Sequence, residues 1–457
     1  MIQLRLFLKR NFDKIGNRRL KLSILQAIPF WIASIIVGLV TVLFAKLFAL
    51  AESIMLHIFG WHNWIIFIQV PFFMIAAWWI VKKWAPYARG SGIPQVMAAT
   101  ELINHSPKTN VEKLLSIKVS VIKILSSLLM ALGGAAIGRE GPTIQIAGSI
   151  FSYVNNHIPK NWPKLKRTNM IVAGAAAGLA AAFNTPLGGI VFAVEELSRT
   201  HVTFYRTALF SGVIIAGLTA QGILGPYLYL NSQPIVSGTS LHIFLPVLLV
   251  AIIGGLSGSY LCKWILKILR WKAKALTKNS QHIFFILACA FIISSITYFI
   301  NPSITGSGKE IMLKLLFTTN KSMPWYTFPL RLLGPLVSFT SGGAGGVFAP
   351  GLAAGATLGA IAGNWFNLVP ADINLLILAG MVAFLTGITR TPFTSAILVL
   401  EMTDRHSVIF YLMLAGMVAG LASLLVDKES FYDHLKQDYL FDIKRDEEKK
   451  KPQQQEA

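Results

Sequence analysis

Long runs of apolar residues without any charge recur along the chain. The runs 22–45, 64–81 and 408–426 contain no Asp, Glu, Lys or Arg, and each is close to the ~20 residues that a helix needs to cross a bilayer. Segments of alternating apolar and polar residues, which would indicate a membrane β-barrel, are absent from the sequence. The pattern therefore predicts an all-α, polytopic membrane protein. The predicted long spans are 22–57, 62–84, 207–230, 243–270, 283–300 and 407–426.

Between the long spans, the apolar segments are short and are interrupted by Gly and Pro. The interruptions fall at 90–94, 138–142, 184–189, 305–308, 342–350 and 387–392. A broken helix at membrane depth is tolerated only where it is buried in protein or lines a water-filled cavity. Several such breaks therefore predict a transport site at which interrupted helices converge.

The two halves of the chain share landmarks in the same order. A Gly-Ser-Gly triplet, a Gly-x-x-x-Pro motif and a Thr-Pro pair with a glutamate nine residues after the proline each recur roughly 210 residues later. These landmarks are 90–92 and 306–308, 138–142 and 346–350, and 185–195 and 391–401. Two repeats, about 62–230 and 243–426, are therefore predicted, with the transport site at their interface.

The composition supports a membrane protein, and the charges indicate its orientation. The 457 residues are 54% hydrophobic and only 13% charged, whereas soluble proteins carry about 25% charged residues. The formal net charge is +21, but the basic residues gather between apolar runs, so no nucleic-acid partner is expected. By the positive-inside rule these basic segments are cytoplasmic, which places both termini in the cytoplasm.

The ends of the chain and its cysteines add little chemistry. Residues 1–21 are predicted to form a cytoplasmic amphipathic lead-in, and the charged, Gln-rich tail 441–457 is expected to be disordered. Cys262 and Cys289 lie in or beside apolar stretches, so no disulfide, metal site or cofactor is expected.

A glutamate stands at the start of an apolar helix, within Gly138-Arg139-Glu140-Gly141-Pro142. Proline suits a first-turn helix position, and glycines let the backbone approach a ligand closely. The first N–H groups of a helix have no partner within the helix and attract anions. Because Glu140 is itself an anion beside this helix end, we expect it to compete with a permeating anion for one site. Arg139 is predicted to be a buried structural partner of Glu140.

Two further helix starts offer free backbone N–H groups. In the stretch 90–94, the Ser91 hydroxyl can donate as well, although a simple helix cap is the alternative for this motif alone. The stretch 345–350 offers the same arrangement without a charged side chain. An anion held by peptide dipoles alone can leave quickly, whereas a fixed Lys or Arg would retain it.

Two adjacent glutamates, Glu195 and Glu196, end an apolar segment that starts at Pro186. A carboxylate within a transmembrane segment costs roughly 2.5–3.5 kcal/mol to insert and is therefore a functional candidate. Glu195 matches Glu401 in the second half, which favours a structural role for that pair. Met402 stands where a counterpart of Glu196 would be, so Glu196 is the candidate for a specialised task. Burial can bring the protonation of a carboxyl group close to neutral pH, so Glu140 and Glu196 are both predicted to exchange protons.

Together these features resemble the CLC family of chloride channels and chloride/proton antiporters. The matching stretches are GSGIP at 90–94, GREGP at 138–142, GGVFAP at 345–350 and a tyrosine at Tyr432, and 183–196 and 390–403 are also similar to the family. The resemblance covers roughly residues 25–440. It implies a transmembrane domain over 22–440 with two inverted repeats, a tyrosine-bearing helix near 429–440, and a homodimer with one pore per subunit. It also implies a compact bacterial type of the inner membrane.

The resemblance implies a role for each site residue. Ser91 and Tyr432 would coordinate a central chloride from the inner side, and the amides of Val347 and Phe348 would complete that site. Glu140 would be the gate: ionised it fills the anion position, and protonated it swings away with its proton. Glu196 resembles the family's inner proton-transfer glutamate. The amides that would frame an outer chloride site belong to Gly138, Arg139, Gly141, Gly346 and Ala349.

The sequence leaves more than one function open. Channel members of the family typically lack an acid at the position of Glu196, which favours a secondary-active chloride/proton antiporter over a passive chloride channel. Ser91 favours chloride over nitrate, and together with GREGP it argues against the fluoride-exporting branch. Two positions depart from the family pattern: Gln95 stands where the best-known bacterial exchangers have glutamate, and Ser430 where many members have proline. An intramembrane hydrolase is a third hypothesis, but no nucleophile or zinc motif supports it, so the protein is predicted not to be an enzyme.

Overall fold

The computed structural model describes residues 17–103, 108–197, 206–225, 229–230, 241–404 and 406–455. Across these ranges the regular structure is helical, apart from two isolated β-bridges, as the predicted all-α class requires. Seven helical stretches of the described chain are long and apolar enough to cross a membrane. They contain α2 (Arg18–Trp61), α3 (Ile66–Trp84), α6 (Ile117–Leu132), α10 (Arg206–Leu224), α11 (Phe244–Ala275), α12 (Asn279–Phe299) and α16 (Pro370–Thr389).

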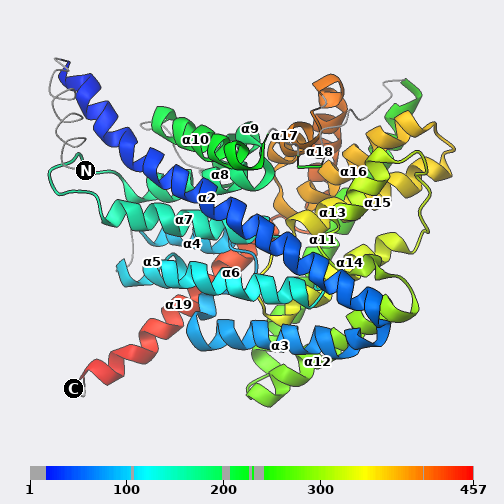
Figure 1. Cartoon of the computed structure of the whole chain (residues 1–457), viewed down its shortest axis with the longest axis horizontal. Coiled ribbons are helices and arrows are strands. Elements are labelled where there is room, and N and C mark those ends of the chain that lie inside the picture. Colours follow the sequence, from blue (N-terminus) through cyan, green and yellow to red (C-terminus); the bar gives the residue numbers. More distant parts are fainter. Residues whose placement is uncertain are drawn as a thin grey trace.

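Helix α2 is the longest element and crosses the front of the molecule diagonally, over helices from both halves (Figure 1). The Asn17 side chain caps its start by accepting the N–H groups of Arg19 and Leu20. Its buried residues include Phe30, Phe44 and Phe48, while many other apolar side chains along it are exposed. A helix that is apolar all round fits a setting in which protein covers one side and lipid the other.

The predicted interruptions are the places at which shorter helices begin. α4 follows Gly92, α13 follows Gly308, and α9 and α17 each start at a proline in the first turn. The span expected at 407–426 is a single-turn 3₁₀ segment followed by α18. The shorter helices are α4 (Ile93–Leu102), α5 (Lys108–Leu114), α7 (Glu140–Asn156), α8 (Arg167–Phe183), α9 (Pro186–Phe192), α13 (Lys309–Phe317), α14 (Thr327–Ser341), α15 (Phe348–Trp365), α17 (Pro392–Thr403) and α18 (Ile409–Leu424).

The pair α9 and α17 shows how the two halves are related. The Glu195 carboxylate, just beyond the end of α9, accepts the N–H groups of Phe393 and Thr394 at the start of α17 (3.2 and 2.7 Å). Reciprocally, the Glu401 carboxylate near the end of α17 accepts the N–H groups of Leu187 and Gly188 (3.1 and 2.7 Å). The two helices therefore run antiparallel, as inverted repeats require. The structural role predicted for Glu195 and Glu401 is confirmed.

Helices α15 and α16 form the most closely packed pair in the second half. Both are almost entirely buried. A Cβ on Gly355 would overlap the backbone carbonyl of Gly380, and a Cβ on Gly359 would overlap that of Leu376. Small residues at such contacts let helix backbones approach each other in membranes. This packing fixes the position of α15 and therefore of its N-terminal end.

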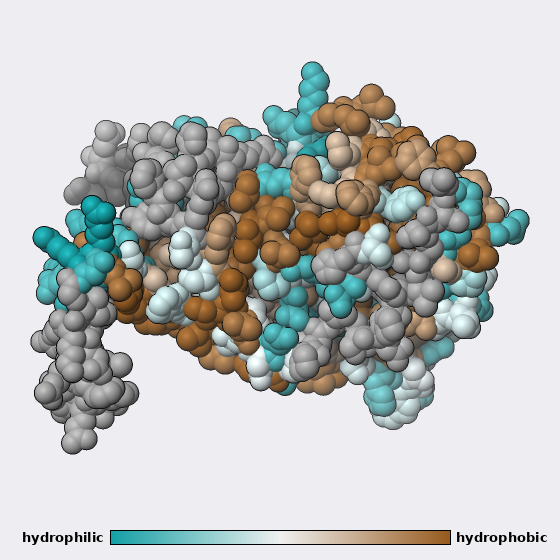
Figure 2. All heavy atoms as spheres, turned by 90° about the horizontal axis from the view of Figure 1, so that it is seen from above, coloured by the Kyte–Doolittle hydropathy of each residue, from teal (hydrophilic) through white to brown (hydrophobic). Residues whose placement is uncertain are grey.

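The molecular surface fits a bilayer. In the coloured part of the face in Figure 2, apolar side chains cover much of the surface, and hydrophilic residues lie around its edge and in smaller groups among them. Phe284, Phe291 and Phe410 are among the most exposed apolar residues, which is unfavourable in water and favourable against lipid. The chain is therefore an integral membrane protein.

The last helix, α19 (Phe431–Gln455), leaves the body of the molecule toward the C-terminus (Figure 1). It includes most of the tail 441–457, for which the composition suggested disorder. Residues such as Glu, Lys, Arg and Gln are good helix formers, and Arg445 pairs with Asp442 one turn earlier (3.5 Å). Of the N-terminal lead-in predicted at 1–21, residues 1–16 lie outside the described part of the chain.

Candidate functional site

The N-terminal ends of α7 and α15 are joined by their backbones. The N–H of Gly138 donates to Gly346 O (2.7 Å), and the N–H of Gly346 donates to Gly138 O (2.8 Å). A Cβ on Gly138 would lie 3.2 Å from the nitrogen of Ala349, and one on Gly346 would lie 3.4 Å from the nitrogen of Gly141. The structure therefore brings together the amides predicted to frame an outer anion site.

The loop before α4 joins the same assembly. The N–H of Gly90 donates to Gly343 O (2.9 Å), and the N–H of Gly345 donates to Gly90 O (3.0 Å). Gly90 and Gly92 have φ angles of 67° and 121°, which glycine adopts without strain. A Cβ on Gly141 would overlap Ser91 Oγ, so the serine side chain lies directly against the start of α7.

Ser91 and Tyr432 place two buried hydroxyl groups in one region. Ser91 is 1% exposed and Tyr432 is fully buried. The two side chains are close enough to influence each other, yet neither hydroxyl has a hydrogen-bond partner among the described residues. Val347 and Phe348 belong to the same buried cluster as Tyr432. Two buried hydroxyl groups that lie near each other and keep donors to spare suit a small anion as a shared acceptor.

Tyr432 is positioned by the start of α19. Ser430 acts as the helix cap: its Oγ accepts the N–H of Asp433 (3.0 Å) and donates to the Asp433 carboxylate (2.8 Å). Ser430 is thus a cap for the helix that bears the tyrosine. The Phe431 ring also packs against Phe339 on α14 (5.5 Å between centroids).

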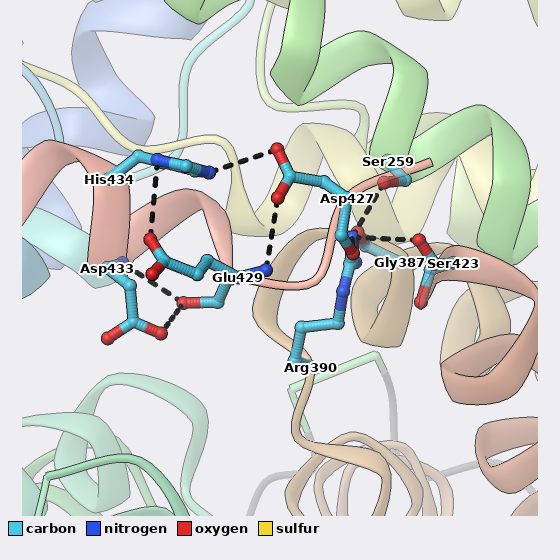
Figure 3. A network of polar contacts seen from close by, with 9 residues as sticks. Ser259, Gly387, Arg390, Ser423, Asp427, Glu429, Asp433 and His434 are labelled. Carbon is cyan, nitrogen blue, oxygen red and sulfur yellow. Dashed lines mark hydrogen bonds and ion pairs between the residues drawn. The ribbon is translucent and has the colours of Figure 1, made fainter. Parts of the chain in front are cut away.

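A polar network precedes this helix (Figure 3). Arg390, at the end of α16, donates to Ser259 Oγ on α11 and to the carbonyl oxygens of Ser423 and Asp427 (2.6, 3.2 and 3.3 Å). The Asp427 carboxylate accepts the N–H of Glu429 (3.0 Å) and contacts His434 Nε2 on α19 (3.0 Å). The network therefore ties the end of α16 to the first turns of α19.

Asp427 lies beyond α18, outside the membrane-spanning segments. Partial burial works to raise the pKa of its carboxyl group, but the hydrogen bonds from Glu429 and His434 and the nearby Arg390 together hold the pKa below its usual value. The ionised carboxylate is therefore the form that the folded network stabilises.

The Glu140 side chain is fully buried at the first residue of α7. Its Oε1 accepts a hydrogen bond from the hydroxyl of Tyr229 (3.0 Å). Its Oε2 lies against Gly138, and the backbone N–H of Ala349 is close enough to interact with the carboxylate. The acid therefore sits at the junction of the two helix starts.

Glu196 lies in η3 (Ala193–Leu197), a π-helical turn that continues α9. It is 2% exposed. Glu140 and Glu196 both interact electrostatically with Tyr432, so both acids lie in the neighbourhood of the same buried tyrosine. π-Helical turns are frequent at functional sites, which fits the specialised task predicted for Glu196.

Arg139 and Gln95 both make structural hydrogen bonds, but Arg139, which was predicted to be a buried partner of Glu140, is only half-buried and bonds to α2. Arg139 Nη1 donates to the carbonyl oxygen of Ala45 on α2 (2.8 Å), which anchors the loop before α7. Gln95 Nε2 donates to Arg89 O (2.7 Å) and to the hydroxyl of Tyr439 on α19 (2.9 Å). The glutamine therefore links α4 to the C-terminal helix.

Sequence reasoning missed three buried residues of this region: Lys123, Arg331 and Tyr229. Lys123 is fully buried, and its Nζ donates to Ala88 O (2.9 Å) and Gly90 O (2.8 Å), behind the Ser91 loop. A signal for Lys123 and Arg331 was present, because each is a cation in an apolar segment at a matching place in the repeats. No sequence pattern singled out Tyr229.

The fold and the site together define the class of the protein. It is an α-helical membrane transport protein, in which interrupted helices from two inverted repeats meet at a buried polar centre. Residues 72–424 match the family described as "Voltage gated chloride channel". The match spans most of the chain, so the protein belongs to this family, the CLC chloride channels and transporters.

Solved structures support the same assignment. A slow cyanobacterial Cl⁻/H⁺ antiporter is similar at 27% identity with a TM-score of 0.76, over 90% of this chain and 98% of that one. A CLC-type fluoride/proton antiporter matches at 21% identity with a TM-score of 0.72, over 91% and 98% of the two chains. A eukaryotic CLC transporter matches at 18% identity with a TM-score of 0.70, over 90% and 74%. The last two likenesses concern the fold alone.

Proposed function

We propose that the protein is a secondary-active antiporter that exchanges chloride for protons, with Glu140 as the gate. The observation that carries the proposal is the position of the Glu140 carboxylate, buried where the starts of α7 and α15 meet. A carboxylate at such a junction occupies a place that suits a permeating anion. The likeness to a cyanobacterial Cl⁻/H⁺ antiporter adds support.

In this mechanism chloride is held by neutral donors. The hydroxyl groups of Ser91 and Tyr432 and the amides of Val347 and Phe348 form the central site. The amides of Gly138, Arg139, Gly141, Gly346 and Ala349 form the outer site. Peptide and hydroxyl dipoles stabilise the anion without a fixed cation in contact, so the ion can leave as readily as it enters.

Protons use the two buried acids. When Glu140 is ionised, its carboxylate fills the outer anion site and blocks chloride. When it is protonated, it loses its attraction for the helix starts and swings away, so chloride takes its place. Glu196 passes the proton between Glu140 and the inner solution. Because one carboxylate alternates with the anion, chloride and proton movements in opposite directions are coupled.

A passive chloride channel of the same fold is the competing function. The decisive experiment is a reconstitution in sealed liposomes, in which an outward or inward chloride gradient drives proton movement against its own gradient. Glu196→Gln should abolish uphill proton movement while chloride flux continues. Glu140→Gln and Glu140→Ala should both remove the coupling. Chloride flux without any proton movement in the wild-type protein would support the channel instead.

The proposed assembly is a homodimer with one pore in each subunit. α10, α17 and α18 carry strongly exposed apolar side chains, among them Leu218, Phe393 and Leu421, and such residues suit a membrane-embedded interface. Subunit counting by single-molecule photobleaching in bilayers should give two copies, and a single bleaching step would contradict the dimer.

With basic segments on the inner side, both termini face the cytoplasm of a bacterial inner membrane.

A further inference from the structure

Tyr229 lies in the connection between α10 and α11, and its side chain reaches the gate. It is 2% exposed. Its hydroxyl donates to Glu140 Oε1 at 3.0 Å, and its ring packs edge-on against Phe183 with 4.8 Å between centroids. This phenol contacts one carboxylate oxygen, while the other oxygen lies toward Gly138.

Two cations hold the tyrosine ring. Lys309, the first residue of α13, places its Nζ 4.8 Å from the ring centroid, and Arg139 places its Cζ 5.9 Å from it. Cations at these distances from an aromatic face are attracted by its π electrons. Residues from both repeats therefore fix the ring, and its hydroxyl is aimed at Glu140.

We propose that Tyr229 is a positioning residue for the gate, whose hydroxyl hydrogen bond holds the ionised Glu140 carboxylate at the junction of α7 and α15. This inference rests on the proposed gating role of Glu140. A phenol donates a hydrogen bond, and a carboxylate accepts it more strongly than a protonated carboxyl group does. The contact therefore favours the ionised, pore-filling state of the gate over the protonated, displaced state.

The charged groups around this contact come from every neighbouring element. Arg139 adjoins Glu140 on the loop before α7, Lys309 comes from α13 and Glu52 from α2. Glu52 accepts the N–H of Ser307 (2.8 Å). Tyr432 lies close enough to Glu140 and Glu196 to interact with both electrostatically. Two cations and one further acid thus surround this contact, and Tyr229 supplies the neutral hydroxyl donor to the Glu140 carboxylate.

Tyr229→Phe removes the hydroxyl and keeps the ring between its cations. Since the lost bond stabilised the ionised carboxylate, Glu140 should accept a proton more readily. In the proposed mechanism only the protonated gate lets chloride pass. The pH at which liposome chloride flux is half-maximal should therefore move upward by about one unit, with faster flux at pH 7. Tyr229→Leu, which also lacks the hydroxyl, should move the profile in the same direction.

Tyr87→Phe is the matched control, because the Tyr87 hydroxyl also donates to a carboxylate, that of Asp446 on α19 (2.7 Å). It should leave the pH profile in place. In a Glu140→Ala background, Tyr229→Phe should change the flux no further. A wild-type profile in Tyr229→Phe, or an equal effect with and without Glu140, would overturn the inference. Failure of the proposed function would appear separately, as absent proton coupling in the wild-type protein.

Discussion

Lys123 and Arg331 occupy matching places in the two halves of the chain, each behind a Gly-Ser-Gly loop. The Lys123 ammonium donates to carbonyl oxygens at Ala88 and Gly90. The fully buried Arg331 guanidinium donates to carbonyl oxygens at Ser303 and Thr305 (both 2.9 Å). A buried cation that binds several carbonyl oxygens of a loop fixes the conformation of the loop backbone. The N–H groups of the loop then point away from the cation. In both repeats, therefore, a buried cation stabilises the Gly-Ser-Gly loop by binding carbonyl oxygens in or next to it.

The two loops differ in what they hold, which gives a first prediction. The loop at 90–92 presents Ser91 to the proposed chloride site, whereas the N–H of Ser307 binds the Glu52 carboxylate (2.8 Å). Lys123→Met should weaken chloride binding about tenfold or more, because buried carbonyl groups lose their donor and the Ser91 loop shifts. Arg331→Met should lower the unfolding temperature with little change in chloride affinity. Isothermal titration calorimetry with chloride in detergent measures the first effect, and an equal loss of affinity in both variants would contradict it.

Substitutions of the adjacent acids should affect different properties: stability for Glu195 and proton coupling for Glu196. Glu195→Leu leaves the N–H groups of Phe393 and Thr394 without their acceptor, so the unfolding free energy should fall by about 1–3 kcal/mol, and Glu401→Leu should behave alike. Glu196→Gln should leave stability nearly unchanged and remove proton coupling. Thermal unfolding in detergent, combined with liposome flux, separates the two roles. Intact proton coupling in Glu196→Gln would refute the division.

The close approach of Ser91 to α7 can be tested with one methyl group. Gly141→Ala places a Cβ where Ser91 Oγ lies, so the serine must move and chloride affinity should drop several-fold. Gly222→Ala on α10 is the control, because nothing lies within 4 Å of its added Cβ and alanine favours a helix. Chloride titration of both variants checks the difference, and unchanged affinity in Gly141→Ala would show that Ser91 does not contribute to binding.

The Asp427 network predicts a loss of stability in acid. Because the folded state holds the pKa of Asp427 below its usual value, the network's contribution is complete above the unfolded pKa, about 3.9. It is lost as the pH falls through the lower folded pKa. The unfolding temperature in detergent should decline more steeply between pH 5 and pH 3 for the wild-type protein than for Asp427→Asn. The variant should be less stable at pH 6, and identical slopes would exclude this role for Asp427.

Particular residues show how much of the structure can be predicted from the sequence. The shared structural role of Glu195 and Glu401 could be anticipated, because two acids at equal distances after matching prolines are a local pattern repeated in each half. The contact of Tyr229 with Glu140 could not. It joins segments 89 residues apart, and nothing in the periodicity around Tyr229 indicates where its hydroxyl points. In the tail from Phe441 onward the sequence-based prediction was wrong, because the composition suggested disorder where the structure has a helix.

By itself, the sequence determined the membrane class, the places at which helices break, the repeat, and the acids worth attention, because each is written in hydropathy, in Gly and Pro, or in a charge within an apolar run. Only the tertiary structure decided that the broken ends of α7 and α15 meet, that Ser91 and Tyr432 share a buried region, and that cations stand behind the loops. These relations are long-range contacts, set by how whole helices pack against one another, and packing depends on all their side chains together.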